Sequence, residues 1–348
     1  MTGVRDDLAH ARVLLDLKRY DEAASLLALV VAVEPEDSRA WCLLAQAHLG
    51  NAQYQEAADA AKQAITLAPS DDWPYRLASL AHRHLGHSTS AWKAATEACR
   101  LAPDQWQSYV CLAQAELVRQ MDHKAAERAA ANARRLAPDE PEVHYVSGLV
   151  SFACGRWKAA RAHQERTLAL APGHSGALNE LGRIKLKHLS LARAAQHFIQ
   201  AAQSAPEVSA YSRNVEVVIR RVVNLTIYAA SVASIVLLIV TMDHHVARVM
   251  IVLGYAAIVA LSAGLAAVQL WRMPPQTRPL LRTRRFVLAL GLAYGSILLA
   301  AITAAVTPVD ALSGALLAAT VLIVATRFAA FAILLHNGKS TLGRTSGA

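Results

Sequence analysis

A cluster of three histidines is the first group of side chains in the sequence that could bind a metal ion. His82, His84 and His87 are separated by two, three and five residues. On a helix only His84 and His87 would share a face, because side chains three or four residues apart are neighbours. No cysteine or carboxylate at a suitable spacing completes a set of zinc ligands. The sequence therefore predicts no metal site here.

The other reactive side chains are scattered rather than grouped. The four cysteines, Cys42, Cys99, Cys111 and Cys154, show neither CxxC nor CxxH spacing. No P-loop, GxSxG or HExxH motif occurs, so the usual signatures of phosphate binding, acyl transfer and zinc hydrolysis are missing. We expect a protein that has no cofactor and is not an enzyme.

The distribution of charge separates two parts of the chain. Of its 348 residues 54% are hydrophobic and 18% charged, whereas soluble domains carry about 25% charged residues. Residues 1–208 contain 23 basic and 23 acidic side chains, and residues 209–348 contain 12 basic and 3 acidic ones. The net charge of +9 therefore lies in the apolar part. This argues against a nucleic-acid-binding protein, whose basic excess lies on a soluble face.

Residues 4–207 contain a repeat of about 34 residues. Six prolines mark it with spacings of 34, 34, 35, 34 and 34: Pro35, Pro69, Pro103, Pro138, Pro172 and Pro206. An alanine stands twelve residues before each proline: Ala23, Ala57, Ala91, Ala126, Ala160 and Ala194. Small residues let two antiparallel helices approach closely, and proline ends the second helix of each unit. The pattern predicts six helix pairs.

This pattern resembles the tetratricopeptide repeat family. The resemblance covers about residues 4–207 and includes the aromatic residues Tyr20, Trp41, Tyr54, Tyr75 and Trp157. It implies an all-α fold in which six helix-turn-helix repeats form a right-handed superhelix. Departures from the family pattern occur at Asp7, at an extra residue near 119–124, and at Ser204.

The resemblance also implies a binding site for a protein or peptide. In this family the first helix of each repeat lines a concave groove. The corresponding positions here are Arg39, Arg76, Leu80, Arg83, His84, Val110, Gln114, Leu117, Tyr145, Leu149, Phe152, Asn179, Arg183 and Lys187. Arginines mixed with apolar side chains favour an acidic or C-terminal peptide with hydrophobic anchors. The alternative is that these arginines only solvate the face.

Four apolar segments follow, and each is long enough to cross a membrane as a helix. They occupy residues 222–242, 250–271, 286–306 and 311–335, and none contains Asp, Glu or Lys. The sequence therefore predicts a four-helix transmembrane bundle at 222–335, in contact with lipid. A buried soluble bundle is the alternative. Residues 208–221 have apolar residues at helical spacing, so we expect a helix that caps the last repeat and connects it to the first span.

The placement of basic residues predicts the orientation in the membrane. The loop between Arg272 and Arg285 holds five arginines, whereas residues 243–248 hold one and residues 307–310 hold no basic residue. Because loops rich in Lys and Arg stay in the cytoplasm, both termini should face the cytoplasm, including a tail at 336–348. The first ten residues also lack the apolar stretch of a secretion signal. We expect a multi-pass protein of the cell membrane.

These patterns favour a membrane-anchored scaffold that binds a partner at the cytoplasmic face. The alternative is a regulatory or structural subunit of a transporter or membrane complex, with the bundle and Arg327 carrying the function. Arg327 is the charged residue inside a predicted span, and such a residue marks a functional site or extends to the interface. An intramembrane enzyme has little support, because the nearest reactive side chains are Asp243, His244, His245 and Asp310 in loops.

Overall fold

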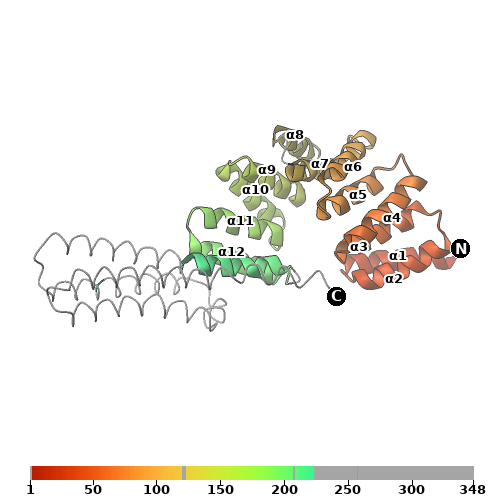
Figure 1. Cartoon of the computed structure of the whole chain (residues 1–348), viewed down its shortest axis with the longest axis horizontal. Helices are drawn as coiled ribbons and strands as arrows, with labels where there is room; N and C mark the ends of the chain where they lie inside the picture. The colour runs from red at the N-terminus through yellow and green to blue at the C-terminus, as the bar shows by residue number, and fades with distance from the viewer. Residues whose placement is uncertain (1, 120–122, 207, 223–256, 258–348) are drawn as a thin grey trace, which may run out of the picture. The chain divides into compact units, whose positions relative to one another are not determined.

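The computed structural model describes residues 2–119, 123–206, 208–222 and residue 257 (Figure 1). Its elements are helices: α1 (Thr2–Asp16), α2 (Tyr20–Val33), α3 (Ser38–Gly50), α4 (Tyr54–Leu67), α5 (Asp72–His84), α6 (Ser88–Leu101), α7 (Trp106–Arg119), α8 (His123–Leu136), α9 (Pro141–Ala153), α10 (Trp157–Leu170), α11 (Ser175–Lys187) and α12 (Leu191–Ser204). Another helix occupies residues 209–222. The predicted all-α helical repeat is confirmed over these residues.

The predicted transmembrane segments lie outside the described residues, apart from residues 222 and 257. The predicted tail at 336–348 and Arg327 lie outside them as well. Within the described ranges, no helix combines the length and the apolar character needed to cross a bilayer.

The ends of the second helices follow directly from the repeat prolines. Each second helix ends two residues before its proline, at Val33, Leu67, Leu101, Leu136, Leu170 and Ser204. Steric clash with the proline ring disfavours helical backbone in the preceding residue, so the chain turns there into the next pair. Two of the following helices begin with a side-chain cap. Asp37 accepts hydrogen bonds from the N–H groups of Arg39 (2.8 Å) and Ala40 (3.3 Å), and Asp71 accepts one from Trp73 (3.1 Å).

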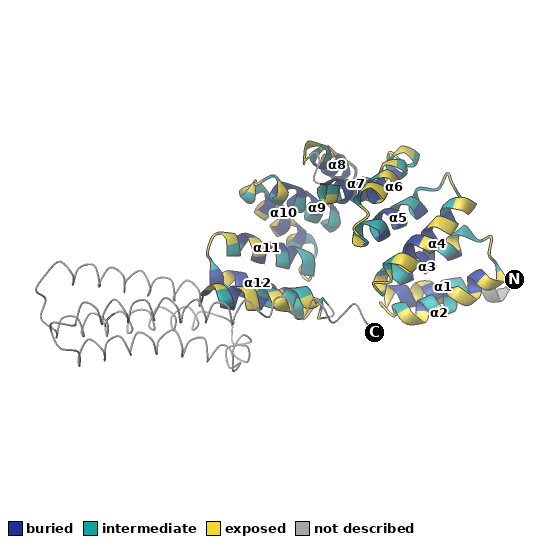
Figure 2. Cartoon of the chain, in the orientation of Figure 1, coloured by how far each residue is buried: buried dark blue, intermediate teal, exposed yellow. Residues whose placement is uncertain are grey.

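Alanine forms much of the core between the helices. The six alanines that stand twelve residues before the prolines are all fully buried: Ala23, Ala57, Ala91, Ala126, Ala160 and Ala194. In second helices such as α4 and α10, buried residues run along one side and exposed residues along the other (Figure 2). First helices are buried on more sides, as the run of buried residues from Cys42 to Ala45 in α3 shows. The small side chains keep the helices of a pair close together, as the sequence pattern predicts.

The chain divides into two compact units, Met1–Ala177 and Leu178–Ala348. In the first unit each first helix packs on its own second helix and on the second helix of the preceding pair. First helices also contact one another, α1 with α3, α3 with α5, α5 with α7 and α7 with α9. Clefts separate the second helices α4 and α6, and the second helices α8 and α10. Because the first helices contact one another whereas clefts separate the second helices, the first helices form the inner side of the stack in this unit.

The described part of the second unit is built around α12 and the helix at 209–222. Val215, Val218, Ile219 and Val222 are buried and form one apolar cluster with residues of α12, among them Phe198. Val218 and Ile219 follow Val215 by three and four residues, and Val222 follows it by seven, so the four positions lie on one face of the helix. That face covers α12.

Candidate functional site

The residues predicted to bind a partner lie on the first helices. Those in the first unit are Arg39 on α3; Arg76, Leu80, Arg83 and His84 on α5; Val110, Gln114 and Leu117 on α7; and Tyr145, Leu149 and Phe152 on α9. We call this set the first-helix face. Asn179, Arg183 and Lys187 lie on α11 in the second unit.

Val110 is a correction to the predicted set. Its side chain is 6% exposed and belongs to the core cluster formed with α8 and α9. The family pattern places position 110 one turn before Gln114, but at that point α7 faces Ala126 and Ala130 of its neighbouring helix rather than solvent. Val110 therefore packs the repeat and is closed to a ligand.

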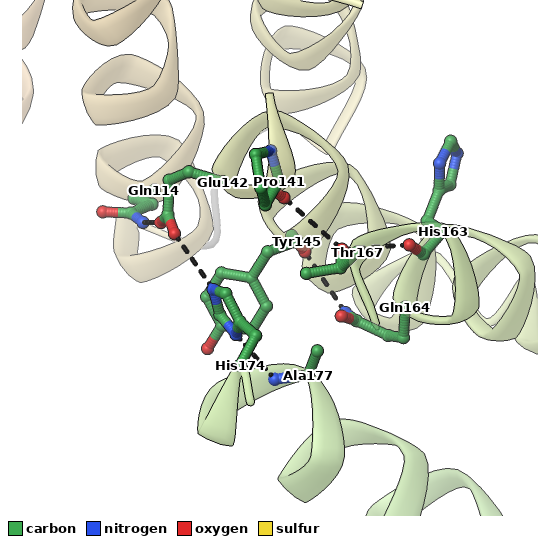
Figure 3. A network of polar contacts seen from close by, with 9 residues as sticks. All are labelled: Gln114, Pro141, Glu142, Tyr145, His163, Gln164, Thr167, His174 and Ala177. Atoms are coloured by element: carbon green, nitrogen blue, oxygen red, sulfur yellow. Dashed lines mark hydrogen bonds and ion pairs between the residues drawn. The ribbon is translucent and has the colours of Figure 1, made fainter. Parts of the chain in front are cut away.

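Within the first unit, a polar network joins α7, α9 and the chain up to Ala177 at the start of α11 (Figure 3). Glu142 on α9 accepts a hydrogen bond from the Gln114 amide on α7 (3.4 Å), and its other oxygen lies 3.3 Å from Nε2 of His174. Nδ1 of His174 accepts a hydrogen bond from the N–H of Ala177 in the first turn of α11 (3.1 Å). The ring of His174 lies 4.7 Å from that of Tyr145, centroid to centroid. The network thus brings Gln114 and Tyr145 together.

Glu142 and His174 are residues that the sequence mapping missed. Glu142 precedes Tyr145 by three residues and so shares its helical face. His174 lies in the turn two residues after Pro172, where the repeat pattern assigns no binding role. The helical spacing of Glu142 was a usable signal, whereas the contact of His174 depends on how the turn folds back.

The arginines of the first-helix face differ in whether a carboxylate of the chain neutralises their charge. Nε of Arg76 lies 2.6 Å from Asp72, which also accepts a hydrogen bond from Ser108 (3.1 Å). Arg83 contacts Nε2 of His84 (3.3 Å), and its own Nε is buried without a hydrogen-bond partner. Arg39 is exposed. Among the described residues, Arg39 and Arg83 have no carboxylate in ion-pairing distance, so they are the cations this face offers to a ligand.

The histidines around this face do not form a metal site. His84 stacks on Tyr54, with the ring centroids 4.3 Å apart, and burial together with the charge of Arg83 lowers its pKa. His87 instead approaches His82, at 5.8 Å between centroids. On one continuous helix His84 and His87 would share a face, but α5 ends at His84 and the chain turns at Gly86, which has a φ of +77°. No group of three His, Cys, Asp or Glu side chains in the described ranges is placed to hold a metal ion.

The predicted residues of the second unit already have partners in the chain. Arg183 donates to both carboxylate oxygens of Glu180, at 2.8 and 3.0 Å. Burial is the largest influence on Glu180 and raises its pKa. Asn179 accepts a hydrogen bond from the Asn214 amide (2.7 Å), which ties α11 to the helix at 209–222. Lys187 is exposed at the end of α11.

The clefts between second helices were not predicted. One, of about 450 Å³, lies between α8 and α10, and the other, also of about 450 Å³, lies between α4 and α6. The α4–α6 cleft mixes Asp59 and Glu97 with Lys62 and Lys93. The α8–α10 cleft is mainly basic. The residues of each cleft come from three helices, so a pattern within one repeat does not reveal them.

Comparison with known proteins supports the repeat assignment. The family model described as tetratricopeptide repeat matches residues 8–72 and 112–175. The helix pairs are tetratricopeptide-like repeats. No catalytic family is indicated by these matches. No curated protein matches the chain.

Solved structures show the same fold at low sequence identity. A tetratricopeptide repeat protein from Parabacteroides merdae is 13% identical with a TM-score of 0.55, and the match covers 62% of this chain and 84% of that one. A chain of the APC/C hetero-tetramer Cut9–Hcn1 is 16% identical with a TM-score of 0.54. The match covers 62% of this chain but 42% of that longer chain. At these identities the likeness concerns the fold alone.

Proposed function

We propose that the protein is a scaffold whose tetratricopeptide-like repeats bind a protein partner along the first-helix face, while residues 222–335 hold it in a membrane. The fold itself indicates protein–protein interaction. The apolar character of the four segments at 222–242, 250–271, 286–306 and 311–335 supports the anchor. In this role the chain binds and positions its partner and does not turn over a substrate.

One observation carries the binding proposal. Consecutive first helices contact one another, so their side chains form a continuous strip in the first unit. Along this strip Arg39 and Arg83 lack carboxylate partners among the described residues. The half-buried side chain of Leu80 lies on α5 with Arg83, and that of Leu149 lies on α9. Charged hydrogen bonds to arginine combined with apolar contacts suit an acidic segment with hydrophobic anchors.

The test is a pulldown with the full chain in detergent, using the substitution Arg83→Glu. Reversing this charge places a carboxylate where an acidic ligand would lie, so the partner should be lost. Arg135→Glu is the matched control, because Arg135 is exposed on the second helix α8 and lies away from the first-helix face. We expect one specific protein to be absent with Arg83→Glu and present with Arg135→Glu. Identical partner lists for both variants and the wild type would contradict the proposal.

A further inference from the structure

The turn between α11 and α12 carries an exposed leucine. Leu189 is 55% exposed and lies between the end of α11 at Lys187 and the start of α12 at Leu191. Two backbone hydrogen bonds close the turn. The N–H of Leu189 donates to the carbonyl of Leu186 (3.2 Å), and the N–H of Ser190 donates to that of Lys185 (3.0 Å). The backbone of the turn is thus fixed, and it presents the leucine side chain away from the core.

Leucine is an unfavourable residue at this position of the turn. Leu189 has a φ of +56°, in the left-handed region that disfavours residues with a Cβ atom. It stands seventeen residues before the repeat proline Pro206. The corresponding residues of the other described turns also have positive φ values: Lys18 (59°), Ala52 (58°), Gly86 (77°) and Gly155 (73°). The turn itself therefore does not require a leucine, and the exposed apolar side chain indicates a contact beyond the repeats.

The turn lies at the same end of the described second unit as residue 222. The helix at 209–222 packs beside α12 (Figure 1), and four residues separate the two helices in the chain. Leu191 at the start of α12 and Val222 belong to one buried cluster, and Leu186 packs against it. Residue 222 is also where the predicted first membrane span begins. Leu189 therefore lies at the level from which the chain would enter a bilayer.

Two exposed arginines lie at this end of the unit. Arg193 is in the first turn of α12, and Arg221 directly precedes Val222. Among the described residues, neither has a carboxylate in ion-pairing distance; the ion pairs of this unit are Arg183–Glu180 and Arg220–Glu216. Arginines near a membrane surface are attracted to anionic headgroups. This end of the unit thus combines an exposed apolar side chain with two cations.

We propose that the α11–α12 turn contacts the membrane surface, with Leu189 inserted at the interface and Arg193 and Arg221 beside anionic headgroups. Apolar side chains flanked by basic ones suit the boundary between headgroups and acyl chains. A protein interface of standard size buries about 800 Å² on each partner, whereas the turn offers one leucine between His188 and Ser190. The inference rests on the proposed anchor at 222–335, and it gives the last repeat a second point of attachment to the bilayer.

The experiment places a photoreactive amino acid at position 189 of the full chain. The chain is reconstituted in vesicles of phosphatidylcholine and phosphatidylglycerol, and lipid adducts are detected by mass spectrometry. The matched control is Leu29, which is 68% exposed on α2 in the first unit. A probe at Leu237, within the predicted first span, reports on the anchor alone. We expect adducts at Leu237, and adducts at position 189 that exceed those at Leu29 about tenfold or more.

The failure of this proposal differs from the failure of the anchor. Adducts at Leu237, with no more at position 189 than at Leu29, overturn the proposed contact and leave the anchor in place. Absence of adducts at Leu237 and at position 189 overturns both. Crosslinks from position 189 to a second copy of the chain, in place of lipid, assign the turn to a protein contact and also overturn the proposal.

A charge variant tests the contribution of the arginines. Arg193→Glu in the chain with the probe at 189 should lower the adduct yield about two- to fivefold, because one basic residue near an anionic surface contributes an effect of this size. Arg135→Glu, at an exposed position on α8, should leave the yield unchanged. Equal yields from the two variants overturn the assignment of Arg193 to the headgroups.

A second probe position keeps the test valid if the chain does not fold with the probe at 189. His188 is exposed in the same turn and lies outside the left-handed region, so a large side chain there causes no backbone strain. The probe at His188 should give the same excess of lipid adducts over Leu29. A yield no higher than that at Leu29 overturns the proposal.

Discussion

At the scale of single residues, the close approach of α9 and α10 depends on Gly148. A Cβ at this position would lie 2.2 Å from the amide nitrogen of Gln164, which is itself fully buried. Gln164 donates to the carbonyl of Tyr145 at 3.2 Å and so cannot move away without losing that hydrogen bond. The absence of a side chain at 148 therefore fixes the geometry of the helix that carries Tyr145.

We predict that Gly148→Ala lowers the free energy of unfolding by about 1–3 kcal/mol, because overpacking a filled core is destabilising. Gly173→Ala is the matched control, since a Cβ there meets nothing within 4 Å, and it should change stability by less than about 0.5 kcal/mol. Urea unfolding of the full chain in detergent, followed by far-UV circular dichroism, measures both. Equal stability of the two variants would show that α9 and α10 are not packed as described.

The thiols give a second prediction at this scale. Burial raises the pKa of Cys42 and of Cys99 to about 12, and that of Cys111 to about 11. At pH 8 the thiolate fraction of Cys42 is then about 10⁻⁴, whereas an unperturbed thiol has a pKa of about 8.5. Iodoacetamide should modify the folded chain slowly at pH 8, with a rate that rises as the pH approaches the raised pKa. Unfolding in guanidinium should make all four cysteines reactive, and rapid modification of folded Cys42 would be the opposite result.

The candidate site could be predicted only where it follows the repeat. Gln114 and Tyr145 occupy first-helix positions that the 34-residue period fixes, and the structure places them in one polar network. Val110 was predicted to line the binding face although it is buried, because the repeat period does not determine how a helix is rotated about its own axis against its neighbour. The cleft between α8 and α10 was missed because its lining residues come from two successive repeats.

At the scale of elements, the helix at 209–222 is held by its buried face. Val218 is fully buried against α12, whereas the adjacent Val217 is 40% exposed. We predict that Val218→Ala weakens this contact by about 1–2 kcal/mol, because two buried methyl groups are removed. Val217→Ala should have a smaller effect, since Val217 is exposed and lies outside the apolar cluster.

Hydrogen exchange of the full chain in detergent reports on these two variants. Amides in α12 and in 209–222 should exchange roughly five- to thirtyfold faster with Val218→Ala than in the wild type. Val217→Ala should accelerate the exchange less. If the two variants behave alike, this helix does not depend on its contact with α12.

The helices themselves are the part of the fold that the sequence determines most directly. The proline period fixes where each second helix ends, and the alanines at fixed distance from it fix which side of that helix is buried. Both effects are local, because proline geometry and side-chain size act within one repeat. The clefts between second helices are not determined within one repeat, because they depend on the distance between the second helices of neighbouring repeats.

At the scale of the whole molecule, we propose that the repeats bind a partner and that residues 222–335 anchor the chain. The chain should then stay in the membrane fraction after extraction at alkaline pH. A reporter fused after Ala348 should be cytoplasmic, and one fused after Ala247, between the first two predicted spans, should lie on the other side. The positive-inside rule is the physical basis, because arginine-rich loops such as 272–285 resist translocation. Two reporters on the same side would contradict the four-span prediction.

The most direct measurement of the central claim is photo-crosslinking in intact cells that make the full chain. A photoreactive amino acid replaces Leu80 or Leu149 on the first-helix face, or Gln63, which is exposed on the second helix α4. The account predicts that Leu80 and Leu149 crosslink to the same protein and that Gln63 does not. Crosslinks to that protein from Gln63 alone, or equally from all three positions, would contradict binding along the first helices.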